Sequence, residues 1–405
     1  MMKQIEGGVC AAKGFSASGI HCGIRKNRVK KDLSLIFSEK VADAAAIYTT
    51  NLVKGAPLTV TAQNISDGKA QAMLCNSGNA NTCNANGIEI ATEMCHCLAQ
   101  ELHIDAKNVI VASTGVIGEP LSIEPIQKGV PLLVSSLSED GSRSAAEGIM
   151  TTDTVVKEIA VEFEIDGKVC HLGGIAKGSG MIHPNMATML VFLTTDVAIT
   201  SEMLSYALKT DVTDTFNMVS VDGDTSTNDM VSILANGLAG NSLIDRQGSA
   251  FDIFAKALNT VTVYLCRHIA GDGEGATRLL ECKTYGAIQK DDARKICKSV
   301  ICSSLVKSMI FGADANFGRV LCAIGYSGIA VDPDKIDISF ISPKGSIDVC
   351  KNGKGLPFSE EIAKEILLEK EITIQIDLHQ GDAFATAWGC DLTYEYVKIN
   401  GDYRT

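Results

Sequence analysis

The hydrophobic and polar positions along the chain follow two different periods, and together they predict a mixture of helices and strands. In 87–104, apolar residues that include Ile90, Met94, Leu98 and Leu102 recur at helical spacing and share one face. Similar patterns predict further helices at 123–138, 142–150, 201–216, 248–270, about 290–305 and 359–369. Helices therefore recur along the whole chain and are not confined to one part of it.

Short runs rich in β-branched residues, bounded by turn residues, predict the strands. They are expected at 33–38, 45–50, 108–114, from 188 onward, 216–224, 336–342, 345–350, 371–378, 383–389 and 393–400. The segment 157–176 is predicted to be a hairpin with the Asp166-Gly167 pair at its turn. Because hairpins join some of the strands, the pattern favours an α+β fold of layered sheets and helices over a doubly wound parallel sheet.

Length and composition narrow the class of protein. A chain of 405 residues is too long for one simple core, so two or three domains or one large unit are expected. A content of 46% hydrophobic residues indicates a globular chain. The net charge of −12 argues against a nucleic-acid partner, because phosphates require basic patches. No apolar run approaches the length of a membrane span, and the first ten residues lack the apolar region of a signal peptide. A cytoplasmic protein is expected.

The fourteen cysteines contain no Cys-x-x-Cys pair. Cys95, His96 and Cys97 are consecutive on a predicted helix, where adjacent side chains point to different faces, so no metal site is expected. Most of the other cysteines lie in apolar runs and are predicted to be buried, reduced thiols. Lys177-Gly178-Ser179-Gly180 lacks the spacing of a phosphate-binding loop, and we interpret it as a flexible turn.

Several polar, glycine-rich segments are flanked by runs that resemble core strands. They are 76–87, 113–118, 151–154, 177–180, 220–229, 271–277, 312–319 and 400–405. Each segment alone is typical of an ordinary turn. As a set they are candidates for binding and catalysis, because rigid scaffolds commonly present functional residues on such loops.

Thr188 opens an apolar, β-prone run directly after the turn residues Pro184 and Asn185. A threonine at a strand start is usually structural, because β-branched residues favour strands. A second interpretation is chemical: the Thr188 hydroxyl attacks the Ala187 carbonyl, and water hydrolyses the resulting ester. Thr188 then gains an α-amine with a pKa of about 7.7–8.0, which can act as a general base beside its own hydroxyl.

The ordered segments NSGNAN, STGVIG, TTDT, KGSGMIHPNMATML, SVDGDTSTND, GDGEGAT, ADANFGR and YVKINGDYRT resemble those of the ornithine acetyltransferases, or glutamate N-acetyltransferases, of arginine biosynthesis. The resemblance runs from about Gly7 to Thr405. It departs at Phe317, where family members often have tryptophan, and at the TCNANG that follows NSGNAN. It implies an N-terminal-nucleophile-like fold and self-cleavage between Ala187 and Thr188.

The same resemblance implies the division of the chain and the catalytic residues. Cleavage gives an α chain of residues 1–187 and a β chain of residues 188–405, which stay together and commonly assemble as an α2β2 heterotetramer. Thr188 is the nucleophile that accepts the acetyl group, and Thr114 and Gly115 form the oxyanion hole. The implied substrate-binding residues are Thr151, Lys177, Thr188, Glu274, Asn400 and Thr405. Thr152 competes with Thr151 for the threonine of the TTDT segment.

The implied reaction is a ping-pong acyl transfer. N-acetylornithine acetylates Thr188, ornithine leaves, and glutamate takes the acetyl group to give N-acetylglutamate. The cycle needs no cofactor. Some family members also accept acetyl-CoA as a donor, and the residues do not separate the two types. The N-terminal amine makes a histidine base unnecessary, so His183 is not expected to be catalytic.

Two other functions remain open at this point. An N-terminal-nucleophile aminopeptidase or amidohydrolase of related fold would use Thr188 in the same way but pass the acyl group to water. A protein that binds an amino acid and does not cleave itself would leave the chain intact.

Overall fold

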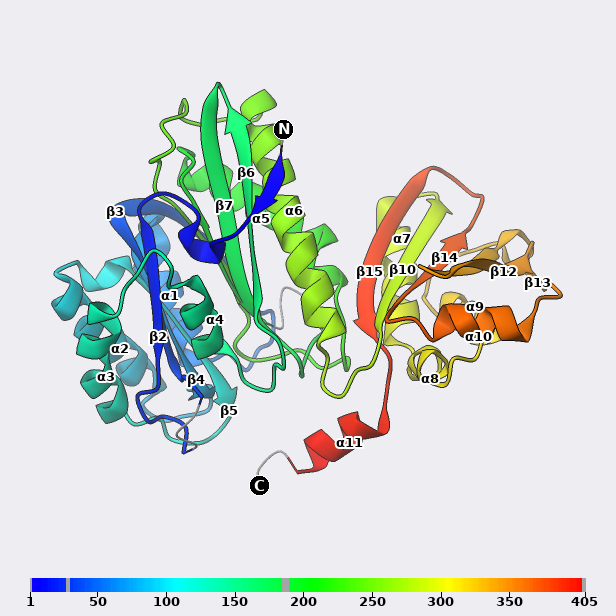
Figure 1. Cartoon of the computed structure of the whole chain (residues 1–405), viewed down its shortest axis with the longest axis horizontal. Helices are drawn as coiled ribbons and strands as arrows, with labels where there is room; N and C mark the ends of the chain where they lie inside the picture. Colours follow the sequence, from blue (N-terminus) through cyan, green and yellow to red (C-terminus); the bar gives the residue numbers. More distant parts are fainter. Residues whose placement is uncertain (1, 27–29, 184–188, 403–405) are drawn as a thin grey trace. The chain divides into compact units, whose positions relative to one another are not determined.

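The computed structural model of the chain describes residues 2–26, 30–183 and 189–402 (Figure 1). Its contacts divide the chain into two compact units. Unit 1 comprises Met1–Gly178, Asn185–Thr213 and Thr225–Leu265, and unit 2 comprises Ser179–Pro184, Asp214–Asp224 and Cys266–Thr405. Each unit contains one sheet with helices packed on it, which confirms the predicted α+β fold.

Unit 1 contains a nine-stranded mixed sheet in the order β1-β6-β7-β8-β9-β3-β4-β5, with β2 paired to β3. The strands are β1 (Lys3–Ile5), β2 (Phe15–Ile20), β3 (Leu33–Tyr48), β4 (Lys69–Asn79), β5 (Val109–Val116), β6 (Lys157–Ile165), β7 (Lys168–Lys177), β8 (Leu190–Thr195) and β9 (Met230–Ala235). β4 with β5 and β8 with β9 are parallel pairs, and the other pairs are antiparallel. β8, which begins two residues after Thr188, lies between β7 and β9 inside this sheet.

Helices enclose both faces of this sheet. They are α1 (Ala56–Asn64), α2 (Gly87–Leu102), α3 (Glu124–Ser135) and α4 (Ser142–Ile149), with α5 (Ser201–Asp214) and α6 (Ser249–Gly271), whose C-terminal ends belong to unit 2. Successive strand residues point to opposite faces, so Leu74 packs in one core cluster with Met94 and Leu98 of α2, while Met73 and Cys75 lie in the other cluster. Figure 1 shows α2 and α3 together on one side of the sheet.

Unit 2 contains a six-stranded sheet in the order β13-β12-β11-β14-β10-β15. Its strands are β10 (Leu279–Ala287), β11 (Asp337–Ser342), β12 (Gly345–Lys351), β13 (Lys354–Gly355), β14 (Glu371–Asp377) and β15 (Ala383–Cys390). Its helices are α7 (Lys290–Cys302), α8 (Ser304–Gly312), α9 (Phe317–Gly325), α10 (Glu360–Leu367) and α11 (Tyr394–Gly401). Short 3-10 helices in the two units cover Gly8–Cys10, Ile65–Asp67, Ala106–Asn108, Phe216–Met218 and Pro333–Lys335.

Most of the predicted elements are confirmed within a few residues. The Asp166-Gly167 turn of the β6–β7 hairpin has φ values of 52° and 73°, which only such turn residues adopt readily. Two strand predictions are wrong, and two correct ones belong to one longer strand. The segments 33–38 and 45–50 form the single strand β3, whose pairing with β4 shifts register between Phe37 and Ala42. The segment 216–224 is a 3-10 turn followed by a loop.

The second wrong strand is 393–400, which is largely the helix α11. Its alternating β-branched residues suggested a strand, but no residue of α11 is buried, so no packed face holds that alternation. Several elements were not predicted at all: β1, β2, β4, β9, β10, β13, α1, α8 and α9. β9 was missed because its buried run MVSILA follows directly on a polar loop.

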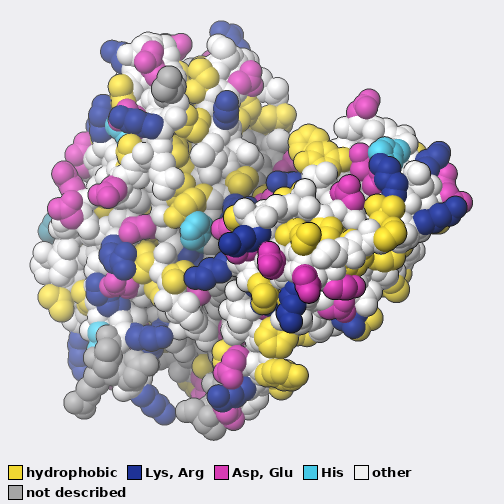
Figure 2. All heavy atoms as spheres, turned by 45° about the vertical axis from the view of Figure 1, so that its right-hand side comes forward, with side chains coloured by type: hydrophobic (Ala, Val, Ile, Leu, Met, Phe, Trp, Pro, Cys, Tyr) yellow, Lys and Arg dark blue, Asp and Glu magenta, His cyan; other side chains and the backbone are white. Residues whose placement is uncertain are grey.

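The surface carries both signs of charge. Figure 2 shows basic and acidic side chains intermixed over the visible face, with hydrophobic side chains between them. Among the described residues, no helix combines the length and hydropathy needed to cross a bilayer.

Candidate active site

The cleavage position itself, Ala187 and Thr188, lies outside the described residues, and so does Thr405. The chain that follows Thr188 is well fixed. The Met189 carbonyl accepts a hydrogen bond of 3.0 Å from the Met230 amide, and Leu190 pairs in register with Lys177 of β7 and Met230 of β9. All residues of β8 are buried. The sheet therefore holds the chain beside Lys177 two residues beyond the predicted nucleophile.

Thr114 and Gly115 lie near the end of β5, where they pair with Ser77 and Gly78 of β4. Thr114 is 9% exposed. Gly115 has φ +133°, and a Cβ atom there would lie 2.3 Å from the backbone carbon of Gly78. Both the conformation and the close approach of the two strands therefore require glycine at position 115.

A buried network of amide and hydroxyl groups supports the end of β5. Asn228 Nδ2 donates to the carbonyls of Ala80 (2.5 Å) and Ser113 (3.0 Å), and its Oδ1 accepts a hydrogen bond from the Thr82 hydroxyl (2.5 Å). The Ser113 hydroxyl in turn donates to Asn76 Oδ1 at 2.6 Å. Asn228 thus ties the loop before β9 to the residue that precedes Thr114. The sequence placed these residues in polar loops but did not indicate this role.

Lys177 is 8% exposed and ends β7 near a second buried charge, Asp153. The Asp153 carboxylate accepts hydrogen bonds from Lys157 Nζ (2.7 Å) and from the amides of Thr151 (3.0 Å) and Gly178 (2.7 Å). Burial alone would raise the pKa of Asp153, but the cations of Lys157 and Lys177 outweigh it and lower the pKa. Asp153 is therefore ionised at neutral pH.

Asp153 and Lys157 were not predicted as functional residues. The only signal for Asp153 was its place in the TTDT segment. Thr151 contacts Asp153 through its backbone amide, and both Thr151 and Thr152 are partly exposed. The geometry does not favour one threonine over the other as the substrate ligand.

In unit 2, the structure brings together two predicted substrate ligands that are 126 residues apart. Asn400 Nδ2 of α11 donates to Glu274 Oε2 at 2.8 Å, and Glu274 is 7% exposed. The Glu274 loop packs closely on this helix: Gly275 has φ +69°, and a Cβ there would lie 2.8 Å from the amide nitrogen of Tyr396. Asp391 anchors the far end of the loop by accepting from the Thr277 and Arg278 amides.

His183 also belongs to unit 2. Its Nδ1 lies 3.0 Å from the Ser220 hydroxyl and 3.5 Å from Cys302 Sγ. Burial, with a smaller effect of the Lys298 charge, lowers the pKa of His183 to about 4. The imidazole is therefore neutral at pH 7.

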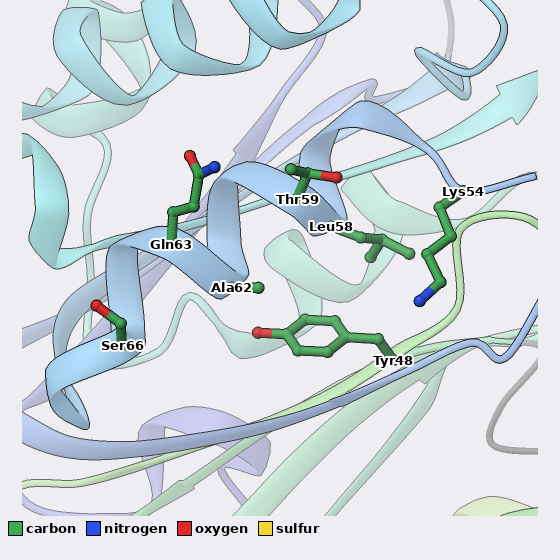
Figure 3. Close-up of a pocket in the computed structure, with 7 residues that line it drawn as sticks. All are labelled: Tyr48, Lys54, Leu58, Thr59, Ala62, Gln63 and Ser66. Carbon is green, nitrogen blue, oxygen red and sulfur yellow. The ribbon is translucent and has the colours of Figure 1, made fainter. Parts of the chain in front are cut away.

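A hollow of about 650 Å³ on unit 1 is separate from the predicted residues. Figure 3 shows Leu58 and Ala62 of α1 on the side of Tyr48, with Lys54 at one end. It is lined by Tyr48, Lys54, Leu58, Thr59, Ala62, Gln63 and Ser66, none of which has a predicted role. Within the described ranges, no group of three His, Cys, Asp or Glu side chains is placed to bind a metal ion.

Residues 16–405 match the family model described as the ArgJ family. The chain belongs to the ArgJ family. It is 50% identical over 405 residues to an arginine biosynthesis bifunctional protein ArgJ of Caldanaerobacter subterraneus subsp. tengcongensis, covering 100% of both chains. It is also 50% identical to ArgJ 1 of Clostridium acetobutylicum, covering 96% of each. A crystal structure of ArgJ from Bacillus halodurans matches with TM-score 0.51 and 45% identity, covering 53% of this chain and 100% of that one.

ArgJ membership confirms the predicted family, fold and enzyme class. ArgJ enzymes are acetyltransferases of arginine biosynthesis that act on derivatives of ornithine and glutamate. The chain is therefore an acyltransferase of this pathway, as the ordered motifs predicted. The roles of single residues, the cleavage and the assembly stay predictions.

Proposed function

We propose that this chain cleaves itself between Ala187 and Thr188 and then moves acetyl groups from N-acetylornithine to glutamate through an acetyl-Thr188 ester. The register of β8 is the observation that supports this most directly. Two residues after Thr188, Leu190 is fixed between Lys177 and Met230 in the sheet, so the new N-terminus would begin beside a buried cation. The α chain (1–187) and β chain (188–405) would share this sheet and stay together.

In the first half-reaction, the Thr188 α-amine takes the proton of the Thr188 hydroxyl as the oxygen attacks the acetyl carbonyl. The Thr114 hydroxyl and the Gly115 amide stabilise the oxyanion. The bond between the acetyl carbon and the ornithine nitrogen then breaks, and the nitrogen takes up the proton. In the second half-reaction, the glutamate amine attacks the ester, and the Thr188 hydroxyl re-forms.

The side chains suit the charges of an amino-acid substrate. Lys177 can pair with a carboxylate, and Glu274 can pair with an ammonium group. Asn400, Thr405 and a threonine at position 151 or 152 can donate or accept further hydrogen bonds. Because acetyl stays within the substrates, the cycle needs no cofactor.

Acetyl-CoA as a second donor for glutamate is a second candidate function. The word bifunctional in the names of the related ArgJ proteins favours it. We also propose an α2β2 assembly and a cytoplasmic location, for which the resemblance is the support.

Intact mass spectrometry of the purified protein tests the proposal. We expect two chains of about 20 and about 23 kDa in place of one of 42.9 kDa, with an acetyl group added only to the larger after N-acetylornithine is supplied. One unmodified chain would contradict both cleavage and the acyl-enzyme.

The rate of ornithine release separates transfer from hydrolysis. If glutamate accelerates ornithine release and becomes N-acetylglutamate, the enzyme is a transferase. If release is independent of glutamate and acetate accumulates, the aminopeptidase or amidohydrolase function is correct.

A further inference from the structure

The Ser179–His183 segment belongs to unit 2, although β7 before it and β8 after it both belong to unit 1. It directly precedes the region of the proposed cleavage. Ser179 and Ile182 are fully buried, so the segment is packed and not a free loop. The sequence had suggested only a flexible turn for 177–180.

One carboxylate holds the middle of this segment. Asp222 Oδ2 accepts the Met181 amide at 2.6 Å, and Oδ1 accepts the Ile182 amide at 2.8 Å. The Val221 amide donates back to the Ile182 carbonyl at 2.6 Å. Backbone amides that donate to one carboxylate fix the position of the chain strongly, because such bonds are charge-assisted.

The start of the segment lies directly against Glu274. The Ser179 carbonyl accepts the Glu274 amide at 2.9 Å, and the Ser179 hydroxyl donates to the Asp272 carbonyl at 2.7 Å. A Cβ atom on Gly180 would lie 2.3 Å from Glu274 Cδ. Gly180 therefore lies directly against the Glu274 carboxylate. A larger side chain at position 180 must displace that carboxylate.

The helix that carries Asn400, α11, packs on the loop of Glu274. Tyr396 of α11 lies directly against this loop, since a Cβ atom on Gly275 would lie 2.8 Å from its amide nitrogen. One turn later on the same helix, Asn400 Nδ2 donates both to the Tyr396 carbonyl (3.0 Å) and to Glu274 (2.8 Å). Asp222 thus holds one of the two elements that contact Glu274, and α11 is the other.

We propose that Asp222 is a positioning residue that holds the Ser179–His183 segment against Glu274, and that Gly180 sets the position of the Glu274 carboxylate for the substrate's ammonium group. This rests on the proposed function for the role of Glu274 itself. If cleavage occurs as proposed, the end of the α chain stays bound to Asp222 and Glu274 of the β chain.

Asp222→Asn tests the proposal, because it removes the charge while keeping the shape of the side chain. N-acetylornithine carries a side-chain ammonium, whereas glutamate carries a second carboxylate there. We expect KM for N-acetylornithine to rise about tenfold, with kcat and KM for glutamate within about threefold of wild type. Asp224→Asn is the matched control, since Asp224 is an exposed acid on the same loop, and it should change neither constant.

Gly180→Ala provides a second test that does not depend on the folding of Asp222→Asn. It should also raise KM for N-acetylornithine, and it should add little in a Glu274→Gln background, because both changes act on one carboxylate. Additive effects, equal losses for both substrates, or unchanged KM values would overturn the inference. The wild type separates the two hypotheses: failure to form N-acetylglutamate contradicts the proposed function, whereas active wild type with unaffected variants contradicts only the positioning role.

Discussion

The two regions that carry the predicted residues are built in different ways. In unit 1, Thr114, Gly115 and Lys177 lie at the ends of strands in the nine-stranded sheet, and buried amide and ion-pair networks support them. In unit 2, Glu274 lies on a loop and Asn400 on α11, a helix with no buried residue. In the first region, paired strands of the sheet position the predicted residues. In the second region, a few polar contacts position them.

This difference matches the tasks that we propose for the two regions. Stabilising an oxyanion requires donors that are already in place, because small displacements of such groups cost large factors in rate. Recognising an ammonium group requires one oriented carboxylate, which a loop and a helix can supply. The comparison therefore predicts losses of kcat from variants of the oxyanion pair in unit 1 and losses of affinity from unit 2 variants.

Thr188→Ala should have the largest effect. It removes the hydroxyl that is the proposed nucleophile in both self-cleavage and acetyl transfer. Transfer should therefore fall by a factor on the order of 10³ or more, and the chain should stay uncleaved. Thr188→Ser is the control, because it keeps a hydroxyl and should still cleave. Electrophoresis and an assay for N-acetylglutamate measure both effects. Normal processing of Thr188→Ala would refute the mechanism.

Thr114→Ala should lower kcat by about 10²–10³, since one oxyanion donor contributes on the order of 3 kcal/mol to the barrier. Cleavage should slow as well, because it passes through the same kind of oxyanion. Thr114→Ser should recover most of both rates. If Thr114→Ala changed only KM, the proposed difference between the two regions would be wrong.

Much of the fold could be predicted because its signals are local. The α2 pattern and the Asp166-Gly167 turn depend on neighbouring residues, and both were predicted correctly. The helix α11 was predicted as a strand because its local pattern suits one, but none of its described residues is buried, so no buried face requires the alternation of a strand. Whether a β-prone segment becomes a strand depends on partners that are distant in sequence.

The candidate site shows the same limit. Thr114 and Glu274 were found because the ordered motifs resemble a family, whereas Asn228 and Asp222 were not. Asn228 acts through Ala80 and Ser113, which are 148 and 115 residues away, and Asp222 acts through amides 40 and 41 residues away. Such roles depend on backbone groups of any residue type, so no side-chain pattern reveals them.

Asp153→Ala tests the rigidity of unit 1 through its stability. It removes the carboxylate that lies 2.7 Å from the buried Lys157 ammonium, so the free energy of unfolding should fall by about 3–5 kcal/mol. Urea denaturation measures the change. Glu124→Gln is the control, because the Glu124–Lys128 pair is exposed and should contribute nothing measurable. Equal stabilities would show that the buried pair does not hold this region.

Glu274→Gln tests the unit 2 region directly. The amide keeps the shape and can still accept a hydrogen bond from Asn400, but it loses the charge that attracts an ammonium group. We expect KM for N-acetylornithine to rise by about 10- to 100-fold, the equivalent of about 1.5–3 kcal/mol. A loss of kcat at constant KM would place Glu274 in the chemical step and would remove the contrast with unit 1.

The smallest effect concerns a histidine of unit 1 that lies apart from the predicted site residues. A hydrogen bond from His171 Nδ1 to Asp196 (2.7 Å) raises the pKa of His171, against the opposing effect of burial, and Glu162 at 3.6 Å adds to the increase. The folded state therefore favours the protonated ring. Its contribution to stability is complete below the unfolded pKa of about 6.5 and is lost as pH rises through the higher folded value.

His171→Asn should thus reduce the free energy of unfolding more at pH 6 than at pH 9, with a change in kcat at neither. Urea denaturation at the two pH values measures the difference. The sign of this pH dependence is informative, because His183 has the opposite one. Burial lowers the pKa of His183 to about 4, so its contribution to stability is lost as pH falls below about 6.5. A larger loss at pH 9 for His171→Asn would mean that the Asp196 contact does not hold the protonated ring, and that this part of unit 1 is less firmly fixed than its strand ends.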